Sequence, residues 1–417
     1  MSEFLLNEVC EIIVDCPHST ANDEGKGYPL VRTPNIGKGR LVYDGMHRVC
    51  EDVYNKRNAR AVPQENDLIF AREATAGNVA LIQKGEKVCL GQRTVLIRPN
   101  QEKVNPAFLT YFLLAPKQQY NLLSTANGAT VAHVNLPTIR NLKIDLPELP
   151  IQHRIASILS RYDSLIENYQ KQIKLLEEAA QRLYKEWFVD LHFPGHENTK
   201  IVDGVPEGWE KNAFGSVIEY EIGGGWGSDT KTTNEIIPAY VIRGTDMSAL
   251  DMGIWKELPY RFHQESNYRA RQLMHNDIIF EVSGGSKNEG VAKTFLVQQE
   301  LLDKLDNHVI CASFCKLIRL RDSSIAYYIY DTLKEWRASG ITAQYDKRSA
   351  SSIVNYRWKD FLSQQEILIP KEIVLRDYIK KSELIHSSIT KKSSQIRLLT
   401  EARDRLLPKL MSGEIAV

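Results

Sequence analysis

The chain has 417 residues, of which 43% are hydrophobic, and its formal net charge at pH 7 is +1. This length exceeds the usual size of one domain and predicts two or three domains. The near-neutral charge neither requires nor excludes binding of nucleic acid, because a basic groove can be local. No apolar run approaches the ~20 residues of a membrane span.

The first part of the chain predicts a small globular domain of short strands. An apolar stretch from Val9 to Val14 comes first, and a helix from Phe108 to Leu114 is expected after Asn105-Pro106. Short runs rich in β-branched or aromatic residues, with turn-forming residues nearby, predict the strands. These runs are Tyr28 to Thr33, Asp67 to Phe70, Thr94 to Ile97 and Ile144 to Pro147.

A long helix follows this domain. Apolar residues recur there at alternating steps of four and three, which is the a/d seam of a coiled coil. The seam positions are Ile155, Leu159, Tyr162, Ile166, Tyr169, Ile173, Leu176, Ala180, Leu183 and Trp187. A helix of about 35 residues spans about 50 Å. Such a helix cannot bury its apolar stripe against one small domain.

The second part of the chain repeats the order of elements in the first. Six segments of the second part match six segments of the first part in the same order along the chain. The matched pairs are Tyr240 to Thr245 with the strand around Arg32, Asn276 to Phe280 with Asn66 to Phe70, Lys316 to Arg319 with Val95 to Arg98, Ala326 to Tyr330 with the Phe108 helix, Gly340 to Thr342 with Gly128 to Thr130, and Ile367 to Pro370 with Ile144 to Pro147. Repeats of 20–50 residues form solenoids, whereas this repeat is a domain with a helix. We therefore interpret the chain as a duplication, with copies at 6–188 and 214–412.

The second copy also ends in a seam. Its apolar positions are Tyr378, Ile385, Ile389, Ile396, Leu399, Leu406 and Leu410. Ser382, Lys392 and Arg403 occupy seam positions, so we expect the second helix to be the less regular one, prone to fray or to accept another chain. A whole domain separates the helices, which favours their antiparallel pairing. The alternative is two unrelated amphipathic helices, each lying on its own domain.

The cysteines and histidines favour no metal site. Cys10, Cys16, Cys50, Cys89, Cys311 and Cys315 lack paired CxxC spacing, and no secretory leader precedes them, so we expect reduced thiols in a cytoplasmic protein. The run HVICASFCKLIRL, which holds Cys311 and Cys315, predicts one buried strand. His192 and His196 flank a Pro-Gly turn.

Two stretches carry a family resemblance. LPELPIQHRIASILSRYDSLIENYQKQIKLLEEAAQRLYKEWF, with VDGVPEGWE further on, resembles the central region of specificity subunits of type I restriction-modification systems, the HsdS family. IRLLTEARDRLLPKLMSGEI resembles the distal repeat of the same family. The resemblance covers the whole chain in the right order. It departs where Lys371 to Arg376 replaces the usual Pro- and Gln-rich start of the second helix.

The resemblance implies the fold class and the domain organisation. The expected fold is α+β, with two globular α/β target recognition domains separated by two long helices that pair as an antiparallel coiled coil, in a pseudo-two-fold duplication. The domains are expected at 1–149 and 191–370, and the helical spacers at 150–190 and 371–417. Each domain is expected to read one half of a bipartite double-stranded DNA site, while the helices set the spacer.

The resemblance also implies partners. Two modification (methyltransferase) subunits are expected to dock on the helical regions, and restriction subunits are expected to join the complex. S-adenosylmethionine, ATP and Mg would then belong to those partners, with no cofactor, metal or catalytic residue in this chain. Outward-facing residues are candidates for the docking surface: Arg161, Lys171, Lys174, Arg182, Lys391 and Arg397.

Polar loops supply the candidate DNA contacts. Arg, Lys, Asn and Gln read base edges, while Lys, Arg, Ser and Thr position phosphates. The candidates are Arg72, Thr75, Asn78, Asn127, Thr130, His133, Lys231, Lys287, Asn288, Gln344, Tyr345, Lys347 and Arg348. The segment TAQYDKRSAS, which holds the last four, has the chemistry best suited to a groove. For each loop the alternative is an ordinary solvated turn.

Catalytic motifs are missing from the sequence. Val291 follows Gly290 where a P-loop needs lysine, and Gly223 to Gly225 lack the surroundings of a dinucleotide fold. The Asn-Pro-Pro-aromatic tetrapeptide of amino-methyltransferases is also absent. These absences favour a recognition subunit. The alternatives are a diverged stand-alone DNA methyltransferase or nuclease, and a scaffolding adaptor that binds proteins instead of DNA.

Overall fold

The computed structural model describes all residues except 1, 125–132, 253–257, 285–289 and 349–353. Contacts divide the chain into two compact units. The first unit comprises residues 1–165 and 399–417, and the second comprises residues 166–398. The long helices thus contribute to both units, and the four domain boundaries expected from the sequence stay a prediction. Within the described ranges, no helix is both long and apolar enough to cross a membrane.

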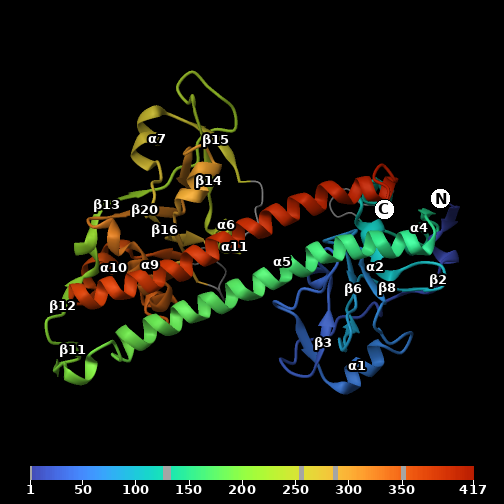
Figure 1. The fold of residues 1–417 in the computed structure, drawn as a ribbon, viewed down its shortest axis with the longest axis horizontal. Helices are drawn as coiled ribbons and strands as arrows, with labels where there is room; N and C mark the ends of the chain where they lie inside the picture. The colour runs from blue at the N-terminus through green and yellow to red at the C-terminus, as the bar shows by residue number, and fades with distance from the viewer. Residues whose placement is uncertain (1, 125–132, 253–257, 285–289, 349–353) are drawn as a thin grey trace. The chain divides into compact units, whose positions relative to one another are not determined.

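The first unit is built from short, mostly antiparallel strands (Figure 1). One sheet has the strand order β2-β8-β5-β6, another β4-β3-β7, and β1 pairs with β9. Its strands are β1 (Ser2–Leu5), β2 (Cys10–Asp15), β3 (Tyr28–Val31), β4 (His47–Val49), β5 (Leu68–Ala71), β6 (Val79–Leu81), β7 (Cys89–Leu90), β8 (Thr94–Pro99) and β9 (Lys143–Leu146). Its shorter helices are α1 (Glu51–Arg57), α2 (Pro106–Leu114), α3 (Pro116–Ser124) and α4 (Leu136–Arg140).

The second unit repeats this topology. Its sheets have the orders β13-β20-β16-β18 and β15-β14-β19, and β12 pairs with β23. The strands are β12 (Glu210–Ala213), β13 (Ile218–Gly223), β14 (Ile237–Ile242), β15 (Tyr260–His263), β16 (Ile278–Glu281), β18 (Thr294–Leu296), β19 (Val309–Cys311), β20 (Cys315–Leu320) and β23 (Glu366–Ile369). The helices are α6 (Gly244–Asp251), α7 (Glu265–Arg271), α8 (Gln299–Lys304), α9 (Ala326–Ala338) and α10 (Trp358–Gln364). The order of elements confirms the duplication.

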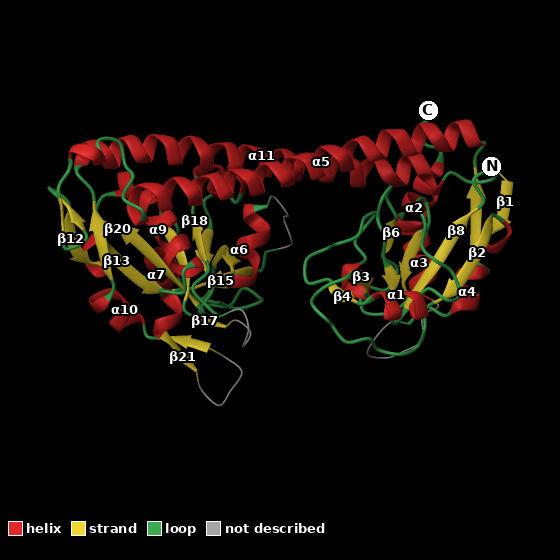
Figure 2. Ribbon diagram, turned by 90° about the horizontal axis from the view of Figure 1, so that it is seen from below, coloured by secondary structure: helices red, strands yellow, loops and turns green. Residues whose placement is uncertain are grey.

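Two small sheets add to this shared plan in the second unit. One joins β17 (Ser283–Gly284), β22 (Val354–Tyr356) and β21 (Asp346–Arg348), and the other is the hairpin of β10 (Ile201–Val202) and β11 (Val205–Pro206). Figure 2 shows β21 on the side of the second unit away from the long helix α11 (Glu372–Ser412). The predicted match of Gly340 to Thr342 with Gly128 to Thr130 falls partly outside the described residues.

The central strand of each large sheet shows why the copies fold alike. Every residue of β5 is buried, with Leu68 and Phe70 in one core and Ile69 and Ala71 in another. The strand alternates its side chains between two faces, so a continuous apolar run belongs to a strand covered on both sides. In the second unit, β16 divides its apolar residues between two cores in the same way.

An ion pair fixes the same point of both sheets. Arg98 of β8 donates from Nε and Nη2 to the carboxylate of Asp67, at 2.8 and 2.7 Å. Arg319 of β20 makes the equivalent bidentate pair with Asp277, at 2.9 and 2.7 Å. Both carboxylates are buried, and each follows an asparagine with positive φ that turns the chain into the strand. Buried charges of this kind are tolerated because both partners are hydrogen-bonded.

One predicted strand is wrong. The run HVICASFCKLIRL forms two strands, β19 and β20, which belong to different sheets. The chain turns between Cys311 and Cys315, where the Cys315 N–H donates to the carbonyl of Ala312. The apolar character of the run is kept because both strands are buried. The sequence reveals the burial but not the turn, since neither Gly nor Pro interrupts the run.

The long helices are α5 (Leu149–Tyr184), which continues as a π-helical turn at Lys185–Val189, and α11 (Glu372–Ser412). In each unit they lie side by side with opposite chain directions (Figure 1). In the second unit the Lys392 ammonium lies over the Tyr169 ring, and Phe188, in the π-helical turn after α5, packs on Tyr378 with ring centroids 4.7 Å apart. The antiparallel pairing is therefore confirmed. The predicted seam residues of both helices are buried or half-buried.

The polar seam residues of α11 do not make it irregular, contrary to expectation. The helix is continuous, and each of these residues has a partner on a packed neighbour. The Lys392 ammonium lies 5.5 Å from the centroid of the Tyr169 ring, and Arg403 Nη1 donates to Asp163 Oδ1 at 2.7 Å. Ser382 is fully buried and donates to Asp331 of α9 at 2.6 Å. Polar residues at a seam are tolerated when their hydrogen bonds are satisfied.

Asp331 is the centre of a buried polar cluster in the second unit. Its carboxylate accepts hydrogen bonds from Tyr378 at 2.7 Å and Ser382 at 2.6 Å, and lies 2.8 Å from Nε2 of His386. Burial by itself would raise the pKa of Asp331. The His386 ring and the three hydrogen bonds outweigh burial and lower the pKa.

The first unit has a matching cluster with the roles exchanged. Tyr111 and Asp331 are each the sixth residue of their helices, α2 and α9. Asp163 and His386 lie equally far beyond the prolines that follow β9 and β23. Tyr111 donates its hydroxyl to Asp163. The carboxylate is therefore on the long helix in the first unit and on the domain helix in the second.

We expect Asp331→Ala to destabilise the second unit strongly, because it leaves three buried partners without their acceptor. The loss in free energy of unfolding should be about 3–5 kcal/mol, measured by denaturant titration. Asp377→Ala, at an exposed position of α11 in the same unit, is the control and should change it by less than about 0.5 kcal/mol. Equal effects of the two substitutions would contradict the role of the cluster.

The difference in free energy of unfolding between the wild type and Asp331→Ala should depend on pH. The pKa of Asp331 is lower in the folded state than the unfolded value of about 3.9. Its contribution is therefore fully present above about pH 4 and is lost as the pH falls through the folded-state pKa. The stability gap between the wild type and Asp331→Ala should narrow in acid. A gap that widened there would show that the carboxylate is not held ionised.

Candidate nucleic-acid interface

The loop after β5 holds several predicted DNA contacts, and hydrogen bonds fix it to its neighbours. Arg72 is 8% exposed and donates from Nε to the carbonyl of Val134 at 2.9 Å and from Nη2 to His133 Nε2 at 2.9 Å. His133 Nδ1 lies 2.6 Å from a carboxylate oxygen of Glu73, whose other oxygen lies 2.9 Å from Nε of Arg93. This chain of contacts joins three segments that are distant in sequence.

Thr75 and Asn78 are used in the same way. Thr75 Oγ1 donates to the carbonyl of Thr33, and Asn78 Nδ2 donates to the carbonyl of Ile36, both at 2.9 Å. These bonds attach the loop to the segment that follows β3. The structure thus brings Arg72, Thr75, Asn78 and His133 together in one set of hydrogen-bonded loops around the end of β5. Their contact with DNA stays a prediction, and Asn127 and Thr130 lie outside the described residues.

In the second unit, Lys231 is exposed in the loop between β13 and β14. The same loop carries Trp226, a residue that sequence reasoning missed. The guanidinium of Arg261 lies 4.6 Å from the centroid of the Trp226 ring and forms an ion pair with Asp229. Trp226 is 39% exposed. A partly exposed tryptophan in the glycine-rich run GGGWG was the available signal, because aromatic rings and arginine are common in nucleic-acid contacts.

The segment from Gln344 to Arg348 divides into buried and exposed parts. Tyr345 is 8% exposed, and its hydroxyl donates to Gln365 at 3.3 Å, so it holds the segment in place. Gln344 and Lys347 are exposed, and Lys347 lies on β21 opposite Asn355. Arg348 pairs with Val354 through the backbone. Lys287 and Asn288 lie outside the described residues.

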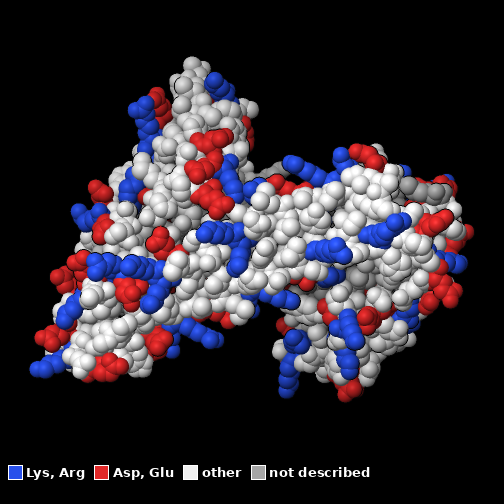
Figure 3. Space-filling view, viewed as in Figure 1, with Lys and Arg blue, Asp and Glu red and all other residues white. Residues whose placement is uncertain are grey.

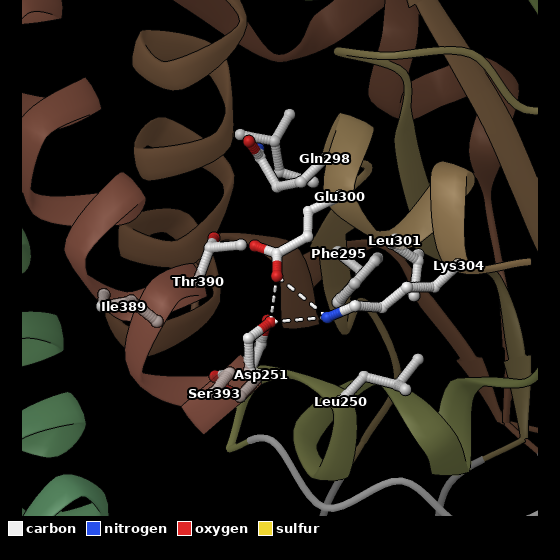
Figure 4. A pocket seen from close by; sticks show the side chains of 12 residues that line it. Leu250, Asp251, Phe295, Gln298, Glu300, Leu301, Lys304, Ile389, Thr390 and Ser393 are labelled. Atoms are coloured by element: carbon white, nitrogen blue, oxygen red, sulfur yellow. Dashed lines mark hydrogen bonds and ion pairs between the residues drawn. The ribbon is translucent and has the colours of Figure 1, made fainter. Parts of the chain in front are cut away.

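A pocket between α6, α8 and α11 is small and its charges are satisfied (Figure 4). Its volume is about 60 Å³. Lys304 Nζ donates to Glu300 at 2.9 Å and to Ser394 at 2.8 Å, and Ser394 also donates to Glu300. Ser393 donates to the carbonyl of Asp251 at 2.6 Å. These contacts attach the second domain to α11 and leave little room for a ligand.

A larger pocket beside α9, of about 290 Å³, mixes acids and bases. Lys334 Nζ lies 3.4 Å from Glu177 of α5. Burial raises the pKa of Asp251, which also lines this pocket, to about 6, although Lys334 acts in the opposite direction. The mixture of charges does not favour binding of a polyanion here.

Neither the surface charges on the face shown nor the described residues of types that bind metals point to one particular binding site. On the face shown in Figure 3, Lys and Arg side chains are interspersed with Asp and Glu. The candidate docking residues of the helices are exposed, except Arg397, which is half-buried. Within the part of the chain that the structure describes, no group of three or more His, Cys, Asp or Glu could hold a metal ion.

We predict that Arg72 and Lys347 differ in what they support. Arg72→Met removes a buried donor of two hydrogen bonds and should lower the free energy of unfolding by about 2–3 kcal/mol. Lys347→Met should leave stability within about 0.5 kcal/mol but weaken binding to a mixed-sequence duplex and reduce the salt slope by about 1. Denaturant unfolding and salt-dependent DNA titration check both. An Arg72 variant that lost DNA binding at full stability would place Arg72 on the DNA.

Comparisons with known proteins agree with one another. Residues 1–178 match the family described as type I restriction modification DNA specificity domain. The chain is 24% identical to the type I restriction enzyme MjaIX specificity subunit of Methanocaldococcus jannaschii, over 94% of this chain and 88% of that protein. It is 22% identical to the HindI specificity subunit of Haemophilus influenzae, over 77% and 80%.

A solved structure shares the fold. The S subunit of the type I restriction-modification system from M. genitalium superimposes with a TM-score of 0.55 at 15% identity, covering 98% of this chain and 95% of that one. The relatives align with most of this chain, and the shared fold agrees with that alignment. Residues 1–178 therefore form a type I restriction modification DNA specificity domain, and the chain as a whole is similar to specificity subunits of type I restriction-modification systems.

Proposed function

We propose that this chain determines the DNA sequence on which a type I restriction-modification complex acts, with each α+β unit reading one half of a bipartite site. The duplicated topology carries the proposal. Two domains with the same strand order and the same Arg–Asp pair present equivalent surfaces, while their loops carry different polar residues. Two domains with the same fold but different loops can recognise two half-sites of different sequence.

The chain is a recognition subunit and not an enzyme, as its relatives are specificity subunits. In the proposed complex, methylation belongs to two modification subunits, and cleavage belongs to restriction subunits. S-adenosylmethionine, ATP and Mg would be bound by those partners. Because its substrate is cellular DNA, the complex would act in the cytoplasm.

The long helices are the proposed docking region for the modification subunits. Five of the six candidate cations, Arg161, Lys171, Lys174, Arg182 and Lys391, are exposed. Their positions leave the apolar seam to the pairing of α5 with α11. A partner bound there would meet a charged helix surface without disturbing that pairing. The same helices are proposed to set the number of unread base pairs between the half-sites.

Exchanging one domain should change one half of the site. A chain in which residues 20–145 come from a relative, produced with the modification subunits, should methylate a site altered in one half and unchanged in the other. Mapping methylated bases in a host genome with and without the chain checks this outcome. The matched exchange in the second unit is the control and should alter the opposite half. Changes in both halves from one exchange would contradict modular reading.

Lengthening both long helices should lengthen the spacer. Seven residues inserted after Leu165 and seven after Arg397 keep each stripe in phase, because the seam repeats every seven residues. About 10 Å of added helix corresponds to about 3 base pairs. The methylation map should show unchanged half-sites with a spacer longer by about that number. An insertion in α5 alone should disrupt the pairing, and a spacer that stayed constant after the double insertion would exclude the helices as its determinant.

A further inference from the structure

A pocket lined by three arginines lies in the first unit, next to the hydrogen-bonded loop of Glu73 and Thr75. Its volume is about 300 Å³, which is within the range of small-molecule sites. Arg32 follows β3, Arg57 ends α1, and Arg93 precedes β8. Figures 1 and 2 show β3 and α1 on the side of the first unit away from α5.

Two of the guanidinium groups have donors that the protein does not use. Arg57 is 5% exposed, and while its Nη2 donates to the carbonyl of Ser19, its Nη1 is buried without a partner among the described residues. Arg32 donates from Nη2 to the carbonyl of Gly45 at 2.9 Å, and its Nε is likewise buried and unpartnered. A buried charged donor without an acceptor is costly, so an acceptor that enters the pocket is favoured.

The surroundings leave the pocket positive and open. Of the nearby carboxylates, Glu73 is paired with Arg93, and Asp23 is exposed. Backbone N–H groups of Arg48 and Gly25 hold the pKa of Asp23 below its usual value. Gly91 lines the pocket and lies close to the backbone that carries Arg32. A Cβ there would lie 2.6 Å from the carbonyl oxygen of Val31 and 3.1 Å from Cγ of Arg32.

The second unit provides an internal comparison because its equivalent positions can be identified. The Gly91 N–H donates to the carbonyl of Val31, and the Ala312 N–H donates to that of Ile242 in the same place. Ala312 therefore stands where the first unit has Gly91. In the same alignment, Arg243 corresponds to Arg32, Arg271 to Arg57, and Phe314 to Arg93.

The arginines of the second unit are already satisfied. Arg243 donates from Nε and Nη2 to the carboxylate of Asp246, both at 2.8 Å, whereas the first unit has the neutral Asn35 at that position. Arg271 donates from Nε to the carbonyl of Gly223 at 2.9 Å and from Nη1 to Asn267. Both copies thus have the two arginines. In the second unit a carboxylate neutralises Arg243, whereas in the first unit Arg32 and Arg57 each keep a buried donor without a partner among the described residues.

We propose that the Arg32–Arg57–Arg93 pocket of the first unit binds a phosphate group, and that the second unit has no equivalent site. A phosphate offers several acceptor oxygens and matches the forked donors of arginine, and its negative charge compensates two guanidinium groups at once. The phosphate comes from the DNA backbone or from a free phosphate ester. The first source rests on the proposed function, and the second does not.

The first arm of the test uses inorganic phosphate and the full chain. Thermal unfolding is compared in sodium phosphate and in sodium chloride of equal ionic strength. Phosphate should raise the melting temperature of the wild type and of Arg48→Gln, which removes an exposed arginine of the same unit. It should have no such effect on Arg32→Gln or Arg57→Gln. Circular dichroism checks that each variant is folded. Arg32→Gln should lose less packing than Arg57→Gln, because Arg32 is half-buried and Arg57 is buried.

The second arm uses the complex with its modification subunits and a mixed-sequence duplex. If the phosphate belongs to DNA, Arg32→Gln should weaken binding several-fold at all sequences and reduce the salt slope by about 1. Arg243→Gln, the counterpart in the second unit, should change neither the slope nor the phosphate response. Equal loss in Arg243→Gln would overturn the difference between the units.

The two arms separate the possible outcomes. A response in the DNA arm, with or without one to inorganic phosphate, assigns the pocket to the DNA backbone, and a response to inorganic phosphate alone assigns it to a free phosphate ester. No response in either arm, or equal losses in Arg48→Gln, overturns the site. A wild-type complex that failed to bind DNA would refute the proposed function, while the phosphate arm would still decide the pocket.

Discussion

The apolar stripe along each long helix is the constraint on which the rest of the structure depends. A stripe that extends for more than four heptads exposes too much apolar surface to be covered by one small domain. In each unit the other long helix covers it, together with one domain helix, α2 in the first unit and α9 in the second. Each copy of the duplication therefore completes a core that contains helix residues from the other copy. Neither copy is self-sufficient in the structure.

Polar residues set the details of this packing. Lys392, Arg403 and Ser382 look like defects in a seam, yet each meets a specific partner. A buried charge is costly unless it is paired, so Lys392 and Arg403 fit only one alignment of α11 with α5, while Ser382 fixes α11 against α9. The apolar stripe supplies most of the driving force, while the polar contacts select the register. This division of roles resembles that of polar residues in other coiled coils.

The sequence predicts regular and repeated features well and individual polar contacts poorly. The periodic apolar stripe predicts the long helices. The Asn-Asp pair followed by a short apolar stretch, which occurs in both copies, predicts the central strands. The turn between β19 and β20 could not be predicted, because Ala312 to Phe314 carry no strong turn signal. The chemistry of Arg72 and His133 predicts contact with DNA, but the sequence does not show that the two side chains bond to each other. The arginine pocket depends on three distant segments meeting and had no local signal.

The exchanged roles of the two buried clusters limit how these genes can recombine. In the first unit the long helix supplies the carboxylate and the domain helix supplies the hydroxyl; in the second the domain helix supplies the carboxylate. Moving the second domain onto the first helix would bring Asp331 against Asp163, two carboxylates in a buried place. Shuffling of recognition domains, one way to gain a new DNA specificity, is therefore constrained by one side chain far from the loops. A functional recombinant must transfer the turn of α11 that holds His386 together with the domain, or replace Asp163 by a hydrogen-bond donor.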